Sequence, residues 1–139
     1  MRQLTHQIRI GTRGRRLYDV TAQVCDWAAA SGMTTGLLTV YIQHTSASLL
    51  INENYDRDVI ADLERFFARL VPDGDPLFEH TVEGPDDMPA HVRTALTQTH
   101  LSIPLIEGRP ALGTWQGIFL YEHRHEPATR RLVLHLAGA

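Results

Sequence analysis

Three of the eight histidines stand at positions where a binding site can form. His44 ends a run of alternating apolar and polar residues, His80 lies in a polar stretch, and His91 lies on the expected inner face of a helix. Neutral imidazole is the commonest metal ligand, and a catalytic zinc takes three protein ligands while keeping one position for water or substrate. The residue types therefore predict a divalent-metal site with zinc as the candidate ion. Because this spacing matches no short metal motif, separate core histidines are the alternative.

Two carboxylates add acid-base chemistry to the predicted site. Glu53 follows the segment that contains His44, where it can act as a general base or orient an imidazole. Asp87 precedes His91 by one helical turn, where it can transfer a proton or simply cap the helix. The predicted catalytic residues are therefore His44, Glu53, Asp87 and His91.

Hydroxyl, amide and indole groups make up the predicted substrate-binding set. A glycine within a strand commonly marks a bulge or the close approach of a ligand, and Gly113 and Gly117 flank three such residues. The set consists of Ser46, Asn52, Thr114, Trp115 and Gln116. Packing of Trp115 in the core is the alternative, in which case its truncation to alanine should cost roughly 3–5 kcal/mol.

Elements that would position these residues follow from the hydrophobic periodicity. Alternation and turn residues predict strands at residues 4–10, 17–20, 36–44, 101–106, 113–123 and 131–136. Helical spacing predicts helices at residues 21–30 and 59–70, and a third that starts at Asp86 or Asp87. The inner face of the third helix is predicted to contain Met88, His91, Val92, Ala95 and Leu96. The order of elements favours a single α+β domain over residues 1–139, with a mixed, mainly antiparallel sheet and helices packed on it.

Composition limits the classes of partner and compartment. The chain has 139 residues and a formal charge of −3, whereas proteins that bind nucleic-acid backbones are normally basic. Cys25 is the only cysteine, which excludes an internal disulfide and an all-thiolate metal site. The first residues lack the apolar region of a signal peptide, and no apolar run approaches the roughly 20 residues that span a bilayer. We expect a cytoplasmic protein that binds neither nucleic acid nor membrane.

Four segments together resemble the YjbQ-like family, also called the secondary thiamine-phosphate synthase family: residues 44–49, 51–54, 83–91 and 112–117. The resemblance implies a compact α+β protomer, a homotrimer, and a polar cleft at His44, His80 and His91 that holds a metal. It also implies a weak thiamine-phosphate synthase activity, which joins a pyrimidine methyl diphosphate to a thiazole phosphate. The chain has no Gly-rich phosphate loop and is too short for a TIM barrel.

Three hypotheses follow. The first is a small enzyme that acts on a phosphorylated heterocycle, with the histidines holding a metal or a phosphate. The second is a metal-dependent hydrolase of another small substrate, in which the same imidazoles activate water. The third is a non-catalytic trimeric binding protein whose histidines only order the core.

Overall fold

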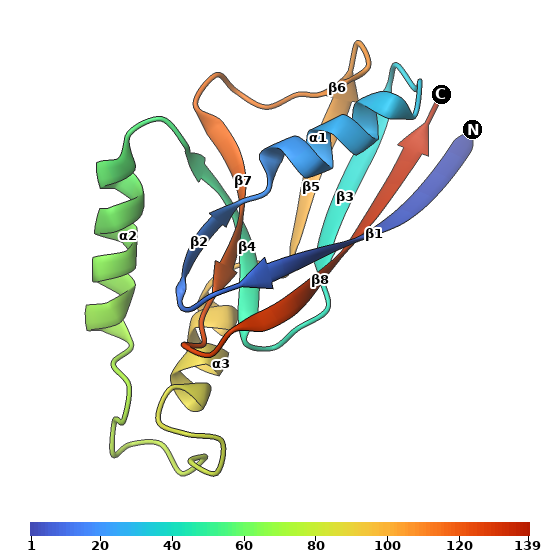
Figure 1. Cartoon of the computed structure of the whole chain (residues 1–139). Coiled ribbons are helices and arrows are strands. Elements are labelled where there is room, and N and C mark those ends of the chain that lie inside the picture. The colour runs from blue at the N-terminus through green and yellow to red at the C-terminus, as the bar shows by residue number, and fades with distance from the viewer.

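A computed structural model describes all 139 residues and contains two antiparallel sheets and three helices (Figure 1). The elements in chain order are β1 (Arg2–Thr12), β2 (Arg16–Asp19), α1 (Thr21–Ala30), β3 (Gly36–Ile42), β4 (Ala47–Glu53), α2 (Arg57–Leu70), α3 (Asp87–Leu96), β5 (His100–Ile106), β6 (Arg109–Pro110), β7 (Gln116–Glu122) and β8 (Ala128–Gly138). No helix combines the length and apolar character that crossing a bilayer requires.

The larger sheet has the strand order β1-β8-β3-β5-β6, and the smaller sheet has the order β2-β7-β4. Every strand pairing is antiparallel, which confirms the predicted α+β class with a mainly antiparallel sheet. The first and last strands pair along their full length, from Arg2 opposite Gly138 to Thr12 opposite Ala128. A two-residue turn joins β5 to β6, and both of its residues, Glu107 and Gly108, have positive φ. Two central residues with positive φ match the twist of the flanking strands.

The main core joins apolar side chains of both sheets and α1. Alternation along a strand places every second side chain on one face, so Leu38, Val40 and Ile42 of β3 all point into this core. Leu49 of β4 and Leu120 of β7 reach it from the smaller sheet, and both are fully buried. Complete burial of each such side chain stabilises the fold by about 1.5–3 kcal/mol.

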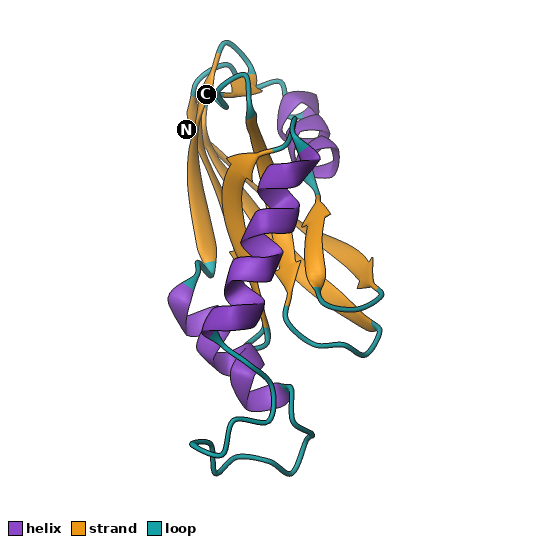
Figure 2. Cartoon of the chain, turned by 90° about the vertical axis from the view of Figure 1, so that its left-hand side faces the viewer, coloured by secondary structure: helices purple, strands orange, loops and turns teal.

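Helix α2 covers the other face of the smaller sheet (Figure 2). Its residues Leu63 and Phe67 pack on a small cluster that includes Phe119 and Tyr121 of β7. Asp56 caps the helix by accepting a hydrogen bond from the Asp58 backbone N–H at 2.9 Å. No residue of α2 is fully buried, because the helix contacts the body along one face only.

Two expectations about elements were wrong. The polar stretch after His44 contains a strand, β4, that was not predicted, and the strand expected from Gly113 begins at Gln116. Strand β4 tolerates polar residues because they find partners: the Ser48 hydroxyl lies 2.8 Å from His123 Nε2 and 2.6 Å from the Thr97 hydroxyl.

The buried face of α3 also differs from the prediction. Asp87, Ala90 and Arg93 are buried, whereas Leu96 is 57% exposed. This helix contacts the body largely through hydrogen-bonded polar groups, which hydrophobic periodicity cannot detect. Its first turn carries the side chains described next.

Candidate metal-binding site

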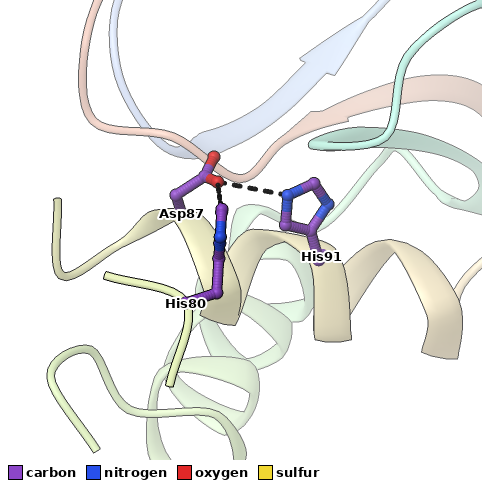
Figure 3. A group of neighbouring side chains, drawn as sticks. All are labelled: His80, Asp87 and His91. Carbon is purple, nitrogen blue, oxygen red and sulfur yellow. Dashed lines mark hydrogen bonds and ion pairs between the residues drawn. The ribbon is translucent and has the colours of Figure 1, made fainter. Parts of the chain in front are cut away.

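His80, Asp87 and His91 form a compact group at the start of α3 (Figure 3). Asp87 and His91 are four residues apart and share one face of the helix. His80 approaches from the preceding loop. Asp87 Oδ2 lies 2.7 Å from His80 Nε2 and 3.1 Å from His91 Nε2. The carboxylate is buried, while the imidazoles are partly exposed, so a bound ligand could reach the group from solvent.

Hydrogen bonding to the backbone assigns one ring hydrogen of His91. Its Nδ1 lies 3.0 Å from the Thr45 carbonyl oxygen, and a carbonyl can only accept, so Nδ1 carries the proton. A neutral His91 ring therefore presents a bare lone pair at Nε2, facing an Asp87 oxygen 3.1 Å away. Two lone pairs at this distance repel unless a cation lies between them. Either a second proton or a metal ion resolves the repulsion.

Arg124, which follows β7, holds the carboxylate from its other side. Its Nη1 donates to Asp87 Oδ1 at 2.5 Å, and its Nε donates to Asp86 Oδ2 at 3.1 Å. Burial alone would raise the pKa of Asp87, but the hydrogen bond from His80, followed by the charge of Arg124, lowers it. Asp87 is therefore ionised at neutral pH. Sequence reasoning missed Arg124, because it lies 37 positions from Asp87 and matches no motif.

His44 lies outside this group. Arg131 N–H donates to its Nε2 at 2.9 Å, and Arg130 Nη1 approaches its Nδ1 at 3.3 Å. Burial, followed by the charges of Arg130 and Arg131, lowers the pKa of His44, so the ring is neutral. The compact group thus contains two of the three predicted metal ligands, His80 and His91. Asp87 takes the place expected for His44.

A polar pocket of about 590 Å³ lies next to His91. It is lined in part by His44, Ser46 and Arg130, and it shares Thr45 with the hydrogen bond of His91. Arg130 Nη2 donates to the Ser46 hydroxyl at 2.9 Å. The buried Glu122 carboxylate pairs with Arg130, so this guanidinium brings no free charge to the pocket.

The other predicted residues gather at the far end of β4. Strand β4 begins at Ala47 opposite Glu122 and ends at Glu53 opposite Gln116. Six residue steps of about 3.3 Å separate the two ends by roughly 20 Å. Asn52, Glu53, Thr114, Trp115 and Gln116 therefore lie together but apart from the metal-binding group.

Trp115 is 54% exposed and rests against Tyr55, with ring centroids 4.8 Å apart. The alternative that placed it in the core is wrong, and its truncation should cost far less than the 3–5 kcal/mol of a core tryptophan, by roughly a factor of two or more. Gln116 is exposed and folds back on its own loop, where its Oε1 accepts a hydrogen bond from Gly113 N–H at 2.8 Å.

Comparison with known proteins gives consistent similarity along the chain. A family model described as "UPF0047 protein YjbQ-like" matches residues 6–139. The UPF0047 protein sll1880 of Synechocystis is 50% identical over 129 residues, covering 93% of this chain and 88% of the relative. The UPF0047 protein YjbQ of Escherichia coli O157:H7 is 43% identical over 130 residues, covering 93% and 94%.

Solved structures share the fold. The hypothetical protein APE1520 from Aeropyrum pernix superposes with a TM-score of 0.86 at 29% identity and full coverage of both chains, 100% each. The conserved hypothetical protein TT1486 from Thermus thermophilus superposes with a TM-score of 0.81 at 32% identity, covering 92% of this chain and 97% of that one. The match to APE1520 spans the whole chain and so includes the loop and helix that carry the metal-binding group.

Proposed function

Since the chain belongs to the YjbQ-like UPF0047 family, we propose that it is a metal-dependent enzyme that acts on a phosphorylated small molecule. His80, Asp87 and His91 would hold a divalent ion. The observation that carries the proposal is the convergence of His80 Nε2 and His91 Nε2 on Asp87 Oδ2, at 2.7 and 3.1 Å, while His91 Nδ1 donates to the Thr45 carbonyl oxygen. A histidine that binds a metal through one ring nitrogen characteristically donates a hydrogen bond from the other ring N–H to a carbonyl or carboxylate, as His91 does here.

The specific reaction that we propose is thiamine-phosphate synthesis. The thiazole nitrogen attacks the methylene carbon of the pyrimidine diphosphate, a C–N bond forms, the C–O bond breaks, and pyrophosphate leaves with the electron pair. A bound divalent ion would neutralise the charge that develops on the leaving diphosphate. No proton is transferred in this step, so the enzyme needs binding and orientation more than a general base.

The chain's own residues supply that orientation. Thr45 fixes the ring of His91, and Arg124 fixes the carboxylate of Asp87, so the donor atoms are held before substrate arrives. The polar pocket beside His91 offers His44 and Ser46 to polar groups of a substrate. Preorganised donors of this kind cost no rearrangement at the moment of reaction.

A metal-dependent hydrolase is the second candidate. Only three side chains form the group, and both imidazoles are partly exposed, so a bound ion would keep positions open to water. The two candidates share the site and differ in product. The hydrolase would release a product from one substrate, whereas the synthase needs two.

The test measures metal content and turnover together. We expect protein purified without a histidine tag to contain about one divalent ion per chain, and to form thiamine phosphate and pyrophosphate from the two substrates. A chelator should abolish turnover, and restoring the ion should recover it. His91→Ala should lose metal and activity, while the control His135→Ala should keep both, because the His135 side chain hydrogen-bonds to Gln3 on the larger sheet and not to the metal-binding group.

Each result decides between the candidates. Hydrolysis of a phosphorylated substrate without coupling would favour the hydrolase. A folded protein that binds no divalent ion, or a His91→Ala variant with unchanged affinity, would overturn the proposal. Equal turnover with and without the ion would leave the group without a catalytic role.

A further inference from the structure

Arg124 places its guanidinium among three oxygen atoms of the segment that precedes and begins α3. Its Nε donates to Asp86 Oδ2 at 3.1 Å, its Nη1 to Asp87 Oδ1 at 2.5 Å, and its Nη2 to the Glu83 carbonyl oxygen at 2.9 Å. The arginine side chain is 18% exposed, so the cluster is largely shielded from water. The Arg124 guanidinium thus lies at the point on which these three oxygen atoms converge.

This arrangement determines how Asp87 can bind an ion. Oδ1 is committed to Arg124, and Oδ2 alone faces His80 and His91. A carboxylate held in this way coordinates through one oxygen only. The site then offers two imidazole nitrogens and a single carboxylate oxygen, a donor set that suits zinc and the neighbouring transition metals.

Calcium has the opposite requirements. It takes six to eight oxygen ligands, with carboxylates often bound through both oxygens. Without Arg124, Asp87 Oδ1 and the Glu83 carbonyl oxygen would lose their partner, and Asp86 Oδ2 would keep only the His125 backbone N–H at 3.0 Å. The guanidinium therefore stands where a hard cation would otherwise find an oxygen-rich site.

From this geometry we infer that Arg124 is a specificity-determining residue, which excludes calcium and restricts the site to transition metals. The inference rests on the proposed metal site and adds to it the class of ion. Arg124 acts through Asp87 and touches neither the ion nor the substrate, so its role is to position the ligand and to keep the neighbouring oxygens occupied.

The experiment compares Zn²⁺ and Ca²⁺ affinities by calorimetric titration of metal-free protein. Removing the arginine also removes a positive charge, which strengthens the binding of any cation. Because the two ions carry the same charge, this effect largely cancels in the ratio of their affinities, and the ratio reports the coordination mode. We expect Arg124→Ala to shift the ratio towards Ca²⁺ by at least about tenfold, the lower end of the usual effect of such supporting residues.

Two further variants keep the test decisive. Arg15→Ala is the matched control, because Arg15 donates two hydrogen bonds to Asp73 of the same loop and one to the His123 carbonyl oxygen, but none to a member of the metal-binding group. Its ratio should equal that of the wild type. Arg124→Lys keeps the positive charge but loses the several N–H donors of the guanidinium. Its ratio of Zn²⁺ to Ca²⁺ affinity should therefore lie between those of the wild type and Arg124→Ala. Circular dichroism establishes that each variant is folded, and Arg124→Lys serves if Arg124→Ala is not.

The outcomes separate this inference from the proposed function. Wild-type protein that binds neither ion would overturn both. Wild-type protein that binds Zn²⁺ while the folded Arg124 variants keep an unchanged ratio would overturn the inference alone and leave the metal site standing. An equal shift in Arg15→Ala would show that loosening the loop, and not the contact with Asp87, changes the selectivity.

Discussion

His123 ends a buried chain of hydrogen-bonded polar groups. Its Nε2 is 2.8 Å from the Ser48 hydroxyl, which in turn is 2.6 Å from the Thr97 hydroxyl. Burial, followed by the positive charges of Arg93, Arg15 and Arg130, lowers the pKa of His123 to about 3. The ring is therefore neutral, and it packs against Tyr121 with ring centroids 4.4 Å apart.

A buried neutral histidine makes stability depend on pH. The unfolded chain binds a proton at this residue near pH 6.5, whereas the folded chain does not until about pH 3. Between these values the unfolded state holds more protons, so the free energy of unfolding falls as the pH is lowered. The loss between pH 7.5 and pH 5.0 should be about 2 kcal/mol, because each pKa unit corresponds to about 1.4 kcal/mol.

Urea unfolding of the wild type and His123→Gln at these two pH values measures the effect. The variant should lack this part of the pH dependence, although its overall stability falls. Both proteins retain His44, whose lowered pKa contributes equally to the two slopes and so cancels. An equal pH dependence of the free energy of unfolding in the two proteins would show that His123 takes up a proton as readily in the folded state as in the unfolded chain.

At the scale of elements, α2 stabilises the smaller sheet through one face. Phe67 meets Tyr121 edge-on, with ring centroids 5.7 Å apart at 89°. Its neighbour Phe66 is 48% exposed and meets the Phe67 ring edge-on, with ring centroids 5.9 Å apart. Two identical side chains at adjacent positions therefore have unequal energetic roles.

We expect Phe67→Ala to lower the free energy of unfolding by about 2–3 kcal/mol, somewhat less than a fully buried phenylalanine, because the ring keeps some exposure. Phe66→Ala should cost less than about 1 kcal/mol, as surface substitutions usually do. Chemical denaturation of the two variants under one condition provides the comparison. Equal losses would mean that α2 gains its stability from helix propensity and not from packing on the sheet.

The sequence predicted elements whose periodicity is set by apolar packing. Helix α1 begins and ends where spacing placed it, and α2 ends at Leu70 before Pro72 as expected. Strand β4 was not predicted because its polar residue Ser48 is buried. The hydrogen-bond partners that make this burial possible, Thr97 and His123, lie 49 and 75 positions away in the sequence. Such long-range hydrogen bonds leave no local pattern in the sequence.

The same distinction applies to the candidate site. His80, Asp87 and His91 were singled out by residue type, and a helical spacing of four brings the last two together. Arg124 carries no comparable signal, since its partners are set by the end of β7. Glu53 follows His44 closely in sequence, yet an intervening extended strand carries the chain roughly 20 Å away.

On the scale of the whole molecule, apolar side chains remain exposed on the larger sheet. Leu37, Tyr41 and Ile106 are 47%, 48% and 57% exposed, respectively. The resemblance to the family predicts a homotrimer, and such assembly commonly covers exposed sheet surface and strand edges. Light scattering should give a mass of about 47 kDa, three times the 15.7 kDa of the chain. A mass of one chain at micromolar concentration would contradict the prediction.

A trimer also allows the two ends of β4 to serve one substrate from different subunits. Within one protomer the distance of roughly 20 Å prevents a small substrate from touching both His91 and Glu53. If both groups are required, co-expressed His91→Ala and Glu53→Gln chains should form mixed trimers with activity that neither variant shows alone. Full activity of the Glu53→Gln variant by itself would show that Glu53, at the far end of β4, is not part of the active site.

The pairing of β1 with β8 governs the order in which the fold can form during synthesis. Thr12 at the end of β1 leaves the ribosome long before Ala128 at the start of β8, and the interval is roughly 6–23 s at about 5–20 residues per second. Strand β8 also separates β1 from β3, so β1 has no partner in its sheet during that time. The larger sheet therefore cannot close until the last strand emerges, so its assembly is completed only at the end of synthesis.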